Sequence, residues 1–164
     1  MSPDLAKIQK TILMLHREAF DESCSPMKLQ KLCYYAQGLA LAEGSLGAEL
    51  FAEEFRAWMH GPVIPDLYHE HKSFGWRQIT TEYADSELIS RDSPIYAHLS
   101  EVVGAFGRFD GGALSTMTHR ESPWCDARDG LAPTDGSTKV IEKSALKKYF
   151  SEILKSDEQV PKDI

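Results

Sequence analysis

The sequence predicts a single, mainly helical domain with a small accessory antiparallel β element. Several long segments repeat apolar residues at the three-four spacing of a helix, whereas one short segment alternates apolar and polar residues as a strand does. A serine followed by proline is typical of a helix start, because the serine oxygen accepts a free amide hydrogen and proline has none to lose. Such pairs occur four times, at Ser2-Pro3, Ser25-Pro26, Ser93-Pro94 and Ser122-Pro123.

The first two Ser-Pro pairs begin the helices expected over residues 3–20 and 26–43, the second closed by Gly44 as its C-terminal cap. The expected buried stripe of the second helix comprises Leu29, Leu32, Cys33, Ala36, Leu39 and Ala40. Lys28 and Lys31 fall outside that stripe, and we expect them on a solvated face opposite the leucines. An alternative use for them is a basic stripe that binds nucleic acid.

The middle of the chain predicts the β element. Residues 54–60 alternate apolar and polar side chains, and Gly61-Pro62 ends this strand. Pro65 opens a helix that is expected to end at residue 72. The segment 78–83, rich in Thr, Ile and Tyr, is a second strand candidate that would pair with the first.

The C-terminal half returns to helices, expected over residues 93–107, 113–118, 123–128 and 144–155. Ser122 should cap the third of these, and Trp124 should pack into the core. The expected buried face of the last helix comprises Leu146, Tyr149, Phe150, Ile153 and Leu154. Residues 139–141 add a possible third strand. We assign residues 1–155 to the domain and 156–164 to a flexible C-terminal tail.

The composition is that of an ordinary globular protein, with 42% apolar and 26% charged residues in a chain of 164. A net charge of −7 argues against nucleic-acid binding, which needs clustered basic residues, and is compatible with a basic protein partner. The start of the chain lacks the features of a signal peptide, and no apolar run is long enough to span a membrane. We therefore expect a cytoplasmic protein with no membrane partner.

Candidates for chemistry are weak. His69 and His71 are two residues apart in an expected helix, so they point to different faces and do not form a zinc pair. His119 lies near Glu121 and Cys125, which leaves a hydrolytic enzyme as one hypothesis, but nothing supplies an oxyanion site. We expect no catalytic residues, no metal and no cofactor, and hence a binding protein.

Three separated motifs resemble those of the Panacea or SocA-type antitoxin family, also known as a phage-associated protein family. The first covers residues 28–38, the second runs from Trp58 through Gly61-Pro62 to Tyr68, and the third covers residues 114–128. The closing pattern of the family corresponds to Ile141 and Tyr149-Phe150. Two positions depart from it: Leu39 stands where many members have an aromatic residue, and His60 where tyrosine or lysine is common.

The resemblance implies an antitoxin that neutralises a cognate toxin, encoded nearby, by direct protein contact. The implied alternative is a proteolytic adaptor that delivers the toxin to a AAA+ protease such as ClpXP, through a protease chaperone. A homodimer stays open. The candidate partner-binding residues belong to the second and third motifs, and several are aromatic: Trp58, His60, Gly61, Pro62, Tyr68, His119, Trp124 and Arg128. The alternative for each of them is a purely structural role.

Overall fold

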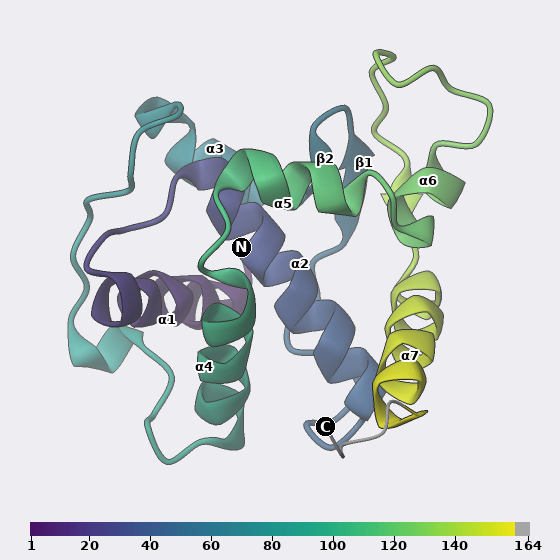
Figure 1. Ribbon diagram of the computed structural model, residues 1–164. Helices are drawn as coiled ribbons and strands as arrows, with labels where there is room; N and C mark the ends of the chain where they lie inside the picture. The colour runs from purple at the N-terminus through teal and green to yellow at the C-terminus, as the bar shows by residue number, and fades with distance from the viewer. Residues whose placement is uncertain (160–164) are drawn as a thin grey trace.

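The protein is described from residue 1 to residue 159 in a computed structural model (Figure 1). Its helices in these residues are α1 (Pro3–Phe20), α2 (Pro26–Glu43), α3 (Pro65–His71), α4 (Pro94–Phe106), α5 (Gly111–Thr118), α6 (Ser122–Ala127) and α7 (Lys143–Gln159). Short 3-10 turns lie at Lys72–Phe74 and Asp85–Glu87. The strands are β1 (Phe55–Trp58), β2 (Gly61–Val63) and β3 (Val140–Ile141), which confirms a mainly helical fold with a small antiparallel sheet.

Helix α2 runs through the middle of the molecule, with α1 and α4 on one side and α7 on the other, while α5 crosses near its N-terminal end (Figure 1). Because neighbours surround α2, its polar residues are buried along with its apolar ones. The expectation that Lys28 and Lys31 lie on a solvated face is therefore wrong, since they are 7% and 1% exposed. The ammonium of Lys28 instead donates to the carbonyl of Gly107, the C-terminal cap of α4.

Three of the four predicted serine caps are confirmed. The hydroxyl oxygens of Ser2, Ser25 and Ser93 accept backbone N–H groups at the starts of α1, α2 and α4. The fourth is wrong, because Ser122 is already inside α6 and the cap residue is Glu121. The Glu121 carboxylate does not cap the helix, since it accepts a hydrogen bond from Tyr35 at 2.9 Å.

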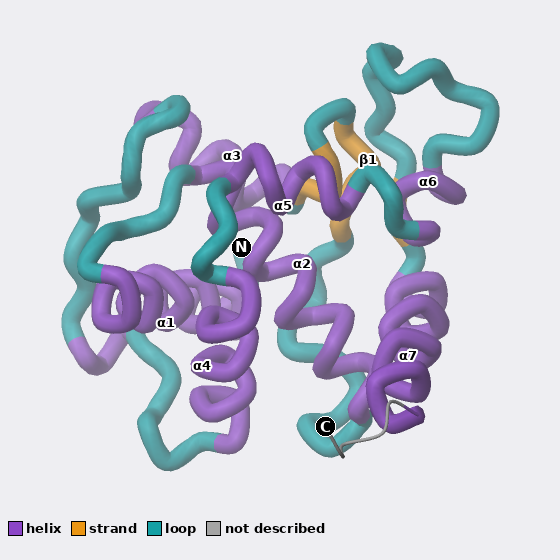
Figure 2. Tube along the Cα trace, viewed as in Figure 1, coloured by secondary structure: helices purple, strands orange, loops and turns teal. Residues whose placement is uncertain are grey.

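The sheet has the order β2-β1-β3, and both pairings are antiparallel (Figure 2). Strand β1 folds straight back onto β2, with Trp58 opposite Gly61, so the partner predicted over residues 78–83 is wrong. Backbone groups of that segment are used elsewhere: the Ile79 amide donates to the Cys24 carbonyl, and the Arg17 guanidinium binds two carbonyls. The third strand predicted near residues 139–141 is confirmed.

Helix α7 adds Leu146 and Phe150 to the same hydrophobic core as α1, α2 and α4. The predicted burial of Ile153 is wrong, because that residue is 37% exposed. The helix also continues to Gln159, so residues 156–159 of the predicted flexible tail are helical, and residues 160–164 lie outside the described part. None of the described helices is long and apolar enough to cross a membrane.

Candidate functional site

Strands β1 and β2 and the turn between them form a tight hairpin, residues 55–63, at the edge of the helical core. Gly61 has a φ of 115°, a conformation that favours glycine. A Cβ atom at this position would lie 2.7 Å from Cε of Lys31 and 2.8 Å from the hydroxyl of Thr118. Glycine is therefore required here both by backbone conformation and by the closeness of α2 and α5.

Side chains of α5, of α6 and of the residue that follows each of these helices bind four successive carbonyl groups of this hairpin. We call these four side chains the clamp. Its contacts are Arg128 Nη1 to Ala57 O at 3.0 Å, Trp124 Nε1 to Trp58 O at 2.8 Å, His119 Nε2 to Met59 O at 2.8 Å, and Ser115 Oγ to His60 O at 2.6 Å. The hydrogen bonds of the clamp thus hold the backbone of the hairpin, and none of these four bonds uses a hairpin side chain.

Helix α2 holds the other end of the hairpin. The Gln30 amide accepts from Ile64 N at 2.9 Å and donates to Ile64 O at 3.0 Å, while Lys31 Nζ donates to Pro62 O at 3.0 Å. The amine of Lys31 is completely buried, and burial lowers its pKa to about 7 because the charged form is deprived of water. These contacts hold the exit from the hairpin into α3 by side-chain hydrogen bonds to its backbone.

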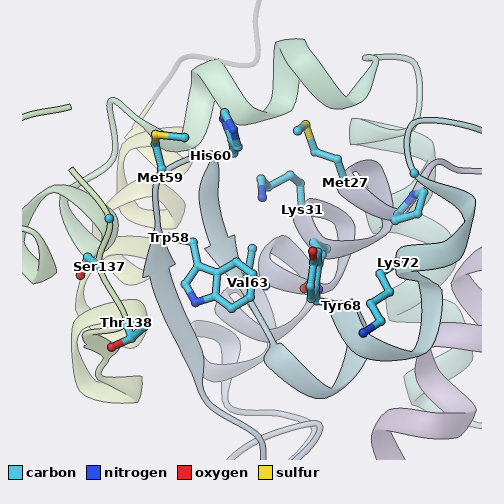
Figure 3. Close-up of a pocket in the computed structure, with 14 residues that line it drawn as sticks. Met27, Lys31, Trp58, Met59, His60, Val63, Tyr68, Lys72, Ser137 and Thr138 are labelled. Carbon is cyan, nitrogen blue, oxygen red and sulfur yellow. The ribbon is translucent and has the colours of Figure 1, made fainter. Parts of the chain in front are cut away.

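A pocket of about 690 Å³ opens between α2, the hairpin, α3 and residues 136–138 (Figure 3). Its apolar lining comes mainly from Met27, Trp58, Met59, Val63 and Tyr68. Its basic groups are Lys31, His60 and Lys72, and Figure 3 shows the Lys31 side chain between the Met27 and Trp58 walls. The pocket combines large apolar side chains with a few polar groups, as ligand and partner sites commonly do.

Exposed apolar side chains gather at this pocket. Met27, Met59 and Tyr68 are 37%, 37% and 41% exposed, and all three line it. Trp76, at 89% exposed, follows Gly75, which also lines the pocket. Tyr68 packs edge-on against Trp58 with ring centroids 5.1 Å apart. An exposed apolar cluster of this kind is typical of a protein-contact surface.

The eight residues singled out in the sequence fall into two groups. Trp58, His60 and Tyr68 line the pocket, whereas His119, Trp124 and Arg128 belong to the clamp, and Gly61 and Pro62 form the buried strand β2 between them. Trp124 packs into the core as predicted. The Arg128 guanidinium donates to the carbonyls of Ala57, Ala132 and Asp135.

Sequence reasoning missed Met27, Lys31, Lys72 and the segment 136–138 as parts of the pocket, and the exposed Trp76 beside the lining residue Gly75. The available signal for Trp76 was a tryptophan in a polar stretch directly after a glycine, where no apolar periodicity assigns it to a core. Segment 136–138 could not be placed from sequence, because it approaches the pocket only after β3 pairs with β1.

The groups considered for chemistry are engaged in structural contacts. Both ring nitrogens of His119 lie near carbonyl oxygens, those of Ser115 and Met59, so neither is directed at Cys125. The Cys125 thiol donates to the His119 carbonyl, and burial raises its pKa. Burial also raises the pKa of Glu121 to about 7. His71 contacts Gln9, and no group of three potential metal ligands occurs within residues 1–159.

A family model described as "Antitoxin SocA-like, Panacea domain" matches residues 29–125. The curated protein "Antitoxin SocA" of Caulobacter vibrioides (strain NA1000 / CB15N) is 28% identical over 129 residues, covering 73% of this chain and 68% of that protein. No solved structure matches the chain. The range matched by the family model contains α2 from Leu29 onward, the hairpin, and the clamp residues Ser115, His119 and Trp124.

Proposed function

The chain belongs to the antitoxin SocA-like, Panacea domain family, and from this premise we propose that it is the antitoxin of a bacterial or prophage toxin–antitoxin system. It neutralises its cognate toxin, encoded nearby, by direct protein–protein contact in the cytoplasm. The observation that carries this proposal is the pocket beside the hairpin, with its exposed Met27, Met59 and Tyr68, and with the exposed Trp76 next to the lining residue Gly75. Large aromatic side chains on a rigid support bind partners well, because little conformational entropy is lost.

Two roles follow for the residues of the site. Trp58, His60 and Tyr68 are the contact residues, together with Met59 and Trp76. The clamp residues act as positioning residues, since their polar atoms bind the hairpin backbone. Substitutions in the two groups should therefore weaken toxin binding for different reasons.

Binding without catalysis is the proposed mode of action. His119 and Cys125 are occupied by backbone contacts, and Lys28 and Lys31 are buried, so they offer no exposed basic stripe to a phosphate backbone. Occlusion of the toxin's active surface requires only a stable interface. Retained neutralisation by His119→Gln, after correction for folding, would agree with a role in positioning and would exclude an essential base.

Co-expression with the product of the neighbouring open reading frame tests the function. We expect the toxin alone to stop growth, this protein to restore it, and the two to co-purify. Tyr68→Ala with Trp76→Ala should abolish both rescue and co-purification, whereas Ile153→Ala, an exposed apolar residue outside the pocket, should retain them. Absence of a complex with any wild-type partner would contradict the proposal.

The adaptor alternative predicts a different outcome in the same cells. An adaptor restores growth by shortening the lifetime of the toxin, and the rescue then depends on an active AAA+ protease. Sequestration leaves the toxin at a normal or raised level and does not depend on the protease. Pulse-chase measurement of the toxin, with and without this protein, separates the two, and size measurement of the free protein decides whether a homodimer forms.

A further inference from the structure

Two side chains that line the pocket, Lys31 and Trp58, carry hydrogen-bond donors that the protein itself does not use fully. Lys31 is 1% exposed, and in the described residues the single hydrogen bond of its amine is to the Pro62 carbonyl. The indole N–H of Trp58 is also buried and finds no acceptor anywhere in residues 1–159. Buried donors without partners are uncommon in folded proteins, and they favour a ligand that brings acceptor atoms.

The charge of the residues that line the pocket also favours a ligand with acceptor atoms. Among the described residues that line the pocket, Lys31, His60 and Lys72 are basic and none is Asp or Glu. The whole chain, in contrast, has a net charge of −7. The pocket is thus a locally basic site on an acidic protein, which favours an anionic group over a cationic one.

The apolar walls of the pocket favour a ligand in which the anionic group lies next to an apolar group. Met27 and Met59 stand at the rim, and Trp58, Val63 and Tyr68 form the sides (Figure 3). Methionine side chains adapt to differently shaped apolar groups. A hydrated phosphate would leave these walls uncovered, whereas an apolar carboxylate uses both the walls and the donors.

We propose that the pocket binds a partner polypeptide at a carboxylate next to an apolar side chain, with the carboxylate on the Lys31 amine and the apolar group against the wall that Trp58, Val63 and Tyr68 form together. The identification of this partner as the toxin rests on the proposed function. The preference of the pocket for an apolar carboxylate is independent of that function. A side-chain carboxylate of Asp or Glu and a C-terminal carboxylate both satisfy this description.

Proton uptake accompanies such binding. With a pKa of about 7, the Lys31 amine is partly neutral in the empty pocket at neutral pH, and an approaching carboxylate favours its charged form. The titratable groups that share the pocket are His60 of the hairpin, Tyr68 of α3 and Lys72 after α3, while α5 presents the hydroxyl of Thr118 near Lys31. None of these is a carboxylate that could charge the amine before the ligand arrives.

The test uses hydrocinnamate as the probe and hydrocinnamide as its uncharged match, titrated into the intact protein by calorimetry and NMR. We expect the carboxylate to bind about tenfold more tightly than the amide, in line with one hydrogen bond to a charged group. In the NMR titration, the resonances of Trp58, Val63 and Tyr68 should show the largest chemical-shift changes. Titration at about pH 8 in two buffers of different ionisation enthalpy should reveal net proton uptake.

Lys31→Met keeps the length of the side chain and removes the amine, so the preference for carboxylate and the proton uptake should both disappear. Lys28→Met is the matched control, because Lys28 is a buried lysine of the same helix that lies outside the pocket. Equal binding of the two probes to the wild type, or an unchanged preference in a folded Lys31→Met, would overturn the proposal.

The experiments distinguish failure of the antitoxin role from failure of the proposed pocket chemistry. If the wild type prefers hydrocinnamate but no toxin is neutralised, the pocket chemistry stands and the antitoxin role falls. If neutralisation occurs and excess hydrocinnamate, but not hydrocinnamide, displaces the toxin, the toxin occupies the pocket through a carboxylate. Neutralisation that neither probe competes with and that Lys31→Met retains would overturn the assignment of the pocket as the docking site.

Discussion

Two regions of the molecule, the clamp and the pocket, meet at the hairpin and use different parts of it. The clamp binds the carbonyl groups of residues 57–60. The pocket presents the side chains of Trp58, Met59 and His60. The backbone of three residues is therefore held by the protein while their side chains face the space that a partner would fill.

This division has a consequence for sequence variation. Carbonyl groups are common to all residues, so the clamp holds the hairpin whatever side chains stand at positions 59 and 60. His60 is an example, because it is fixed through its carbonyl, by Ser115, while its side chain lines the pocket. We infer that the clamp preserves the fold while the pocket rim sets the choice of partner.

The largest expected effect comes from the clamp. Arg128→Ala removes three hydrogen bonds to carbonyls and a guanidinium stacked 4.7 Å from the Trp124 ring, so we expect a loss of about 3 kcal/mol in the free energy of unfolding. Urea denaturation measures this loss. Arg120→Ala, at an exposed arginine, is the control and should change stability by less than about 0.5 kcal/mol. Similar values for the two variants would remove the clamp's assigned role.

Gly61→Ala should have the next largest effect, about 2 kcal/mol, because it combines a strained φ with a clash against Lys31 and Thr118. Gly44→Ala is the matched control, since Gly44 also has a positive φ but has no atom within 4 Å of the added Cβ. We expect the control to cost about 1 kcal/mol. If both cost the same, the close approach of α2 and α5 to the hairpin contributes nothing to stability.

Trp76→Ala tests the pocket side. The indole is almost fully exposed, so we expect unchanged stability but a loss of about 1.5 kcal/mol in toxin-binding free energy. Binding calorimetry and urea denaturation on the same sample measure both quantities. Ile153→Ala serves as the control, because it removes an exposed apolar residue elsewhere. A fall in stability with no change in affinity would reverse the comparison between clamp and pocket.

The sequence predicted the helical frame well and the site less well. Helix starts at Ser2, Ser25 and Ser93 depend on local hydrogen bonds, which a local pattern can reveal. Strand β2 escaped prediction because it has three residues and one is Pro62, and proline is untypical of strands. The burial of Lys31 was missed because α2 is enclosed on all sides, a tertiary fact that helical periodicity does not contain.

The pocket residues also show that a local sequence pattern does not predict contacts made by tertiary packing. Trp58, His60 and Tyr68 lie within ten residues of one another around Gly61-Pro62, so a rigid local element predicts that they gather. Lys31 and residues 136–138 reach the pocket only through the packing of α2 and the pairing of β3 with β1. Contact residues that are close in sequence could be predicted, whereas those brought together by the fold could not.

The pH dependence of stability is expected to have opposite signs for Glu121, beside the clamp, and for Lys31 in the pocket. Glu121, which precedes α6, has a folded pKa of about 7, above its ordinary 4.5, so the folded state binds its proton more tightly. Its contribution to stability is therefore present at low pH and falls as pH rises from 4.5 to 7. Lys31 has a folded pKa of about 7, below its ordinary 10.5, so its contribution rises with pH from 7 upward.

The contributions of these two groups are isolated by subtracting the stability-versus-pH curve of a variant from that of the wild type. Other titrating residues, such as His16, His71 and the buried cysteines, are present in both proteins and cancel in the difference. Relative to the wild type, Glu121→Gln should lose the fall between pH 4.5 and 7, and Lys31→Met should lose the rise between about pH 7 and 9. Each slope is limited to about 1.4 kcal/mol per pH unit, since one proton is involved. Urea denaturation across this range measures them. A Lys31→Met profile parallel to that of the wild type would mean that the amine is already charged in the folded protein, and Lys31 would then hold its proton without a partner's carboxylate.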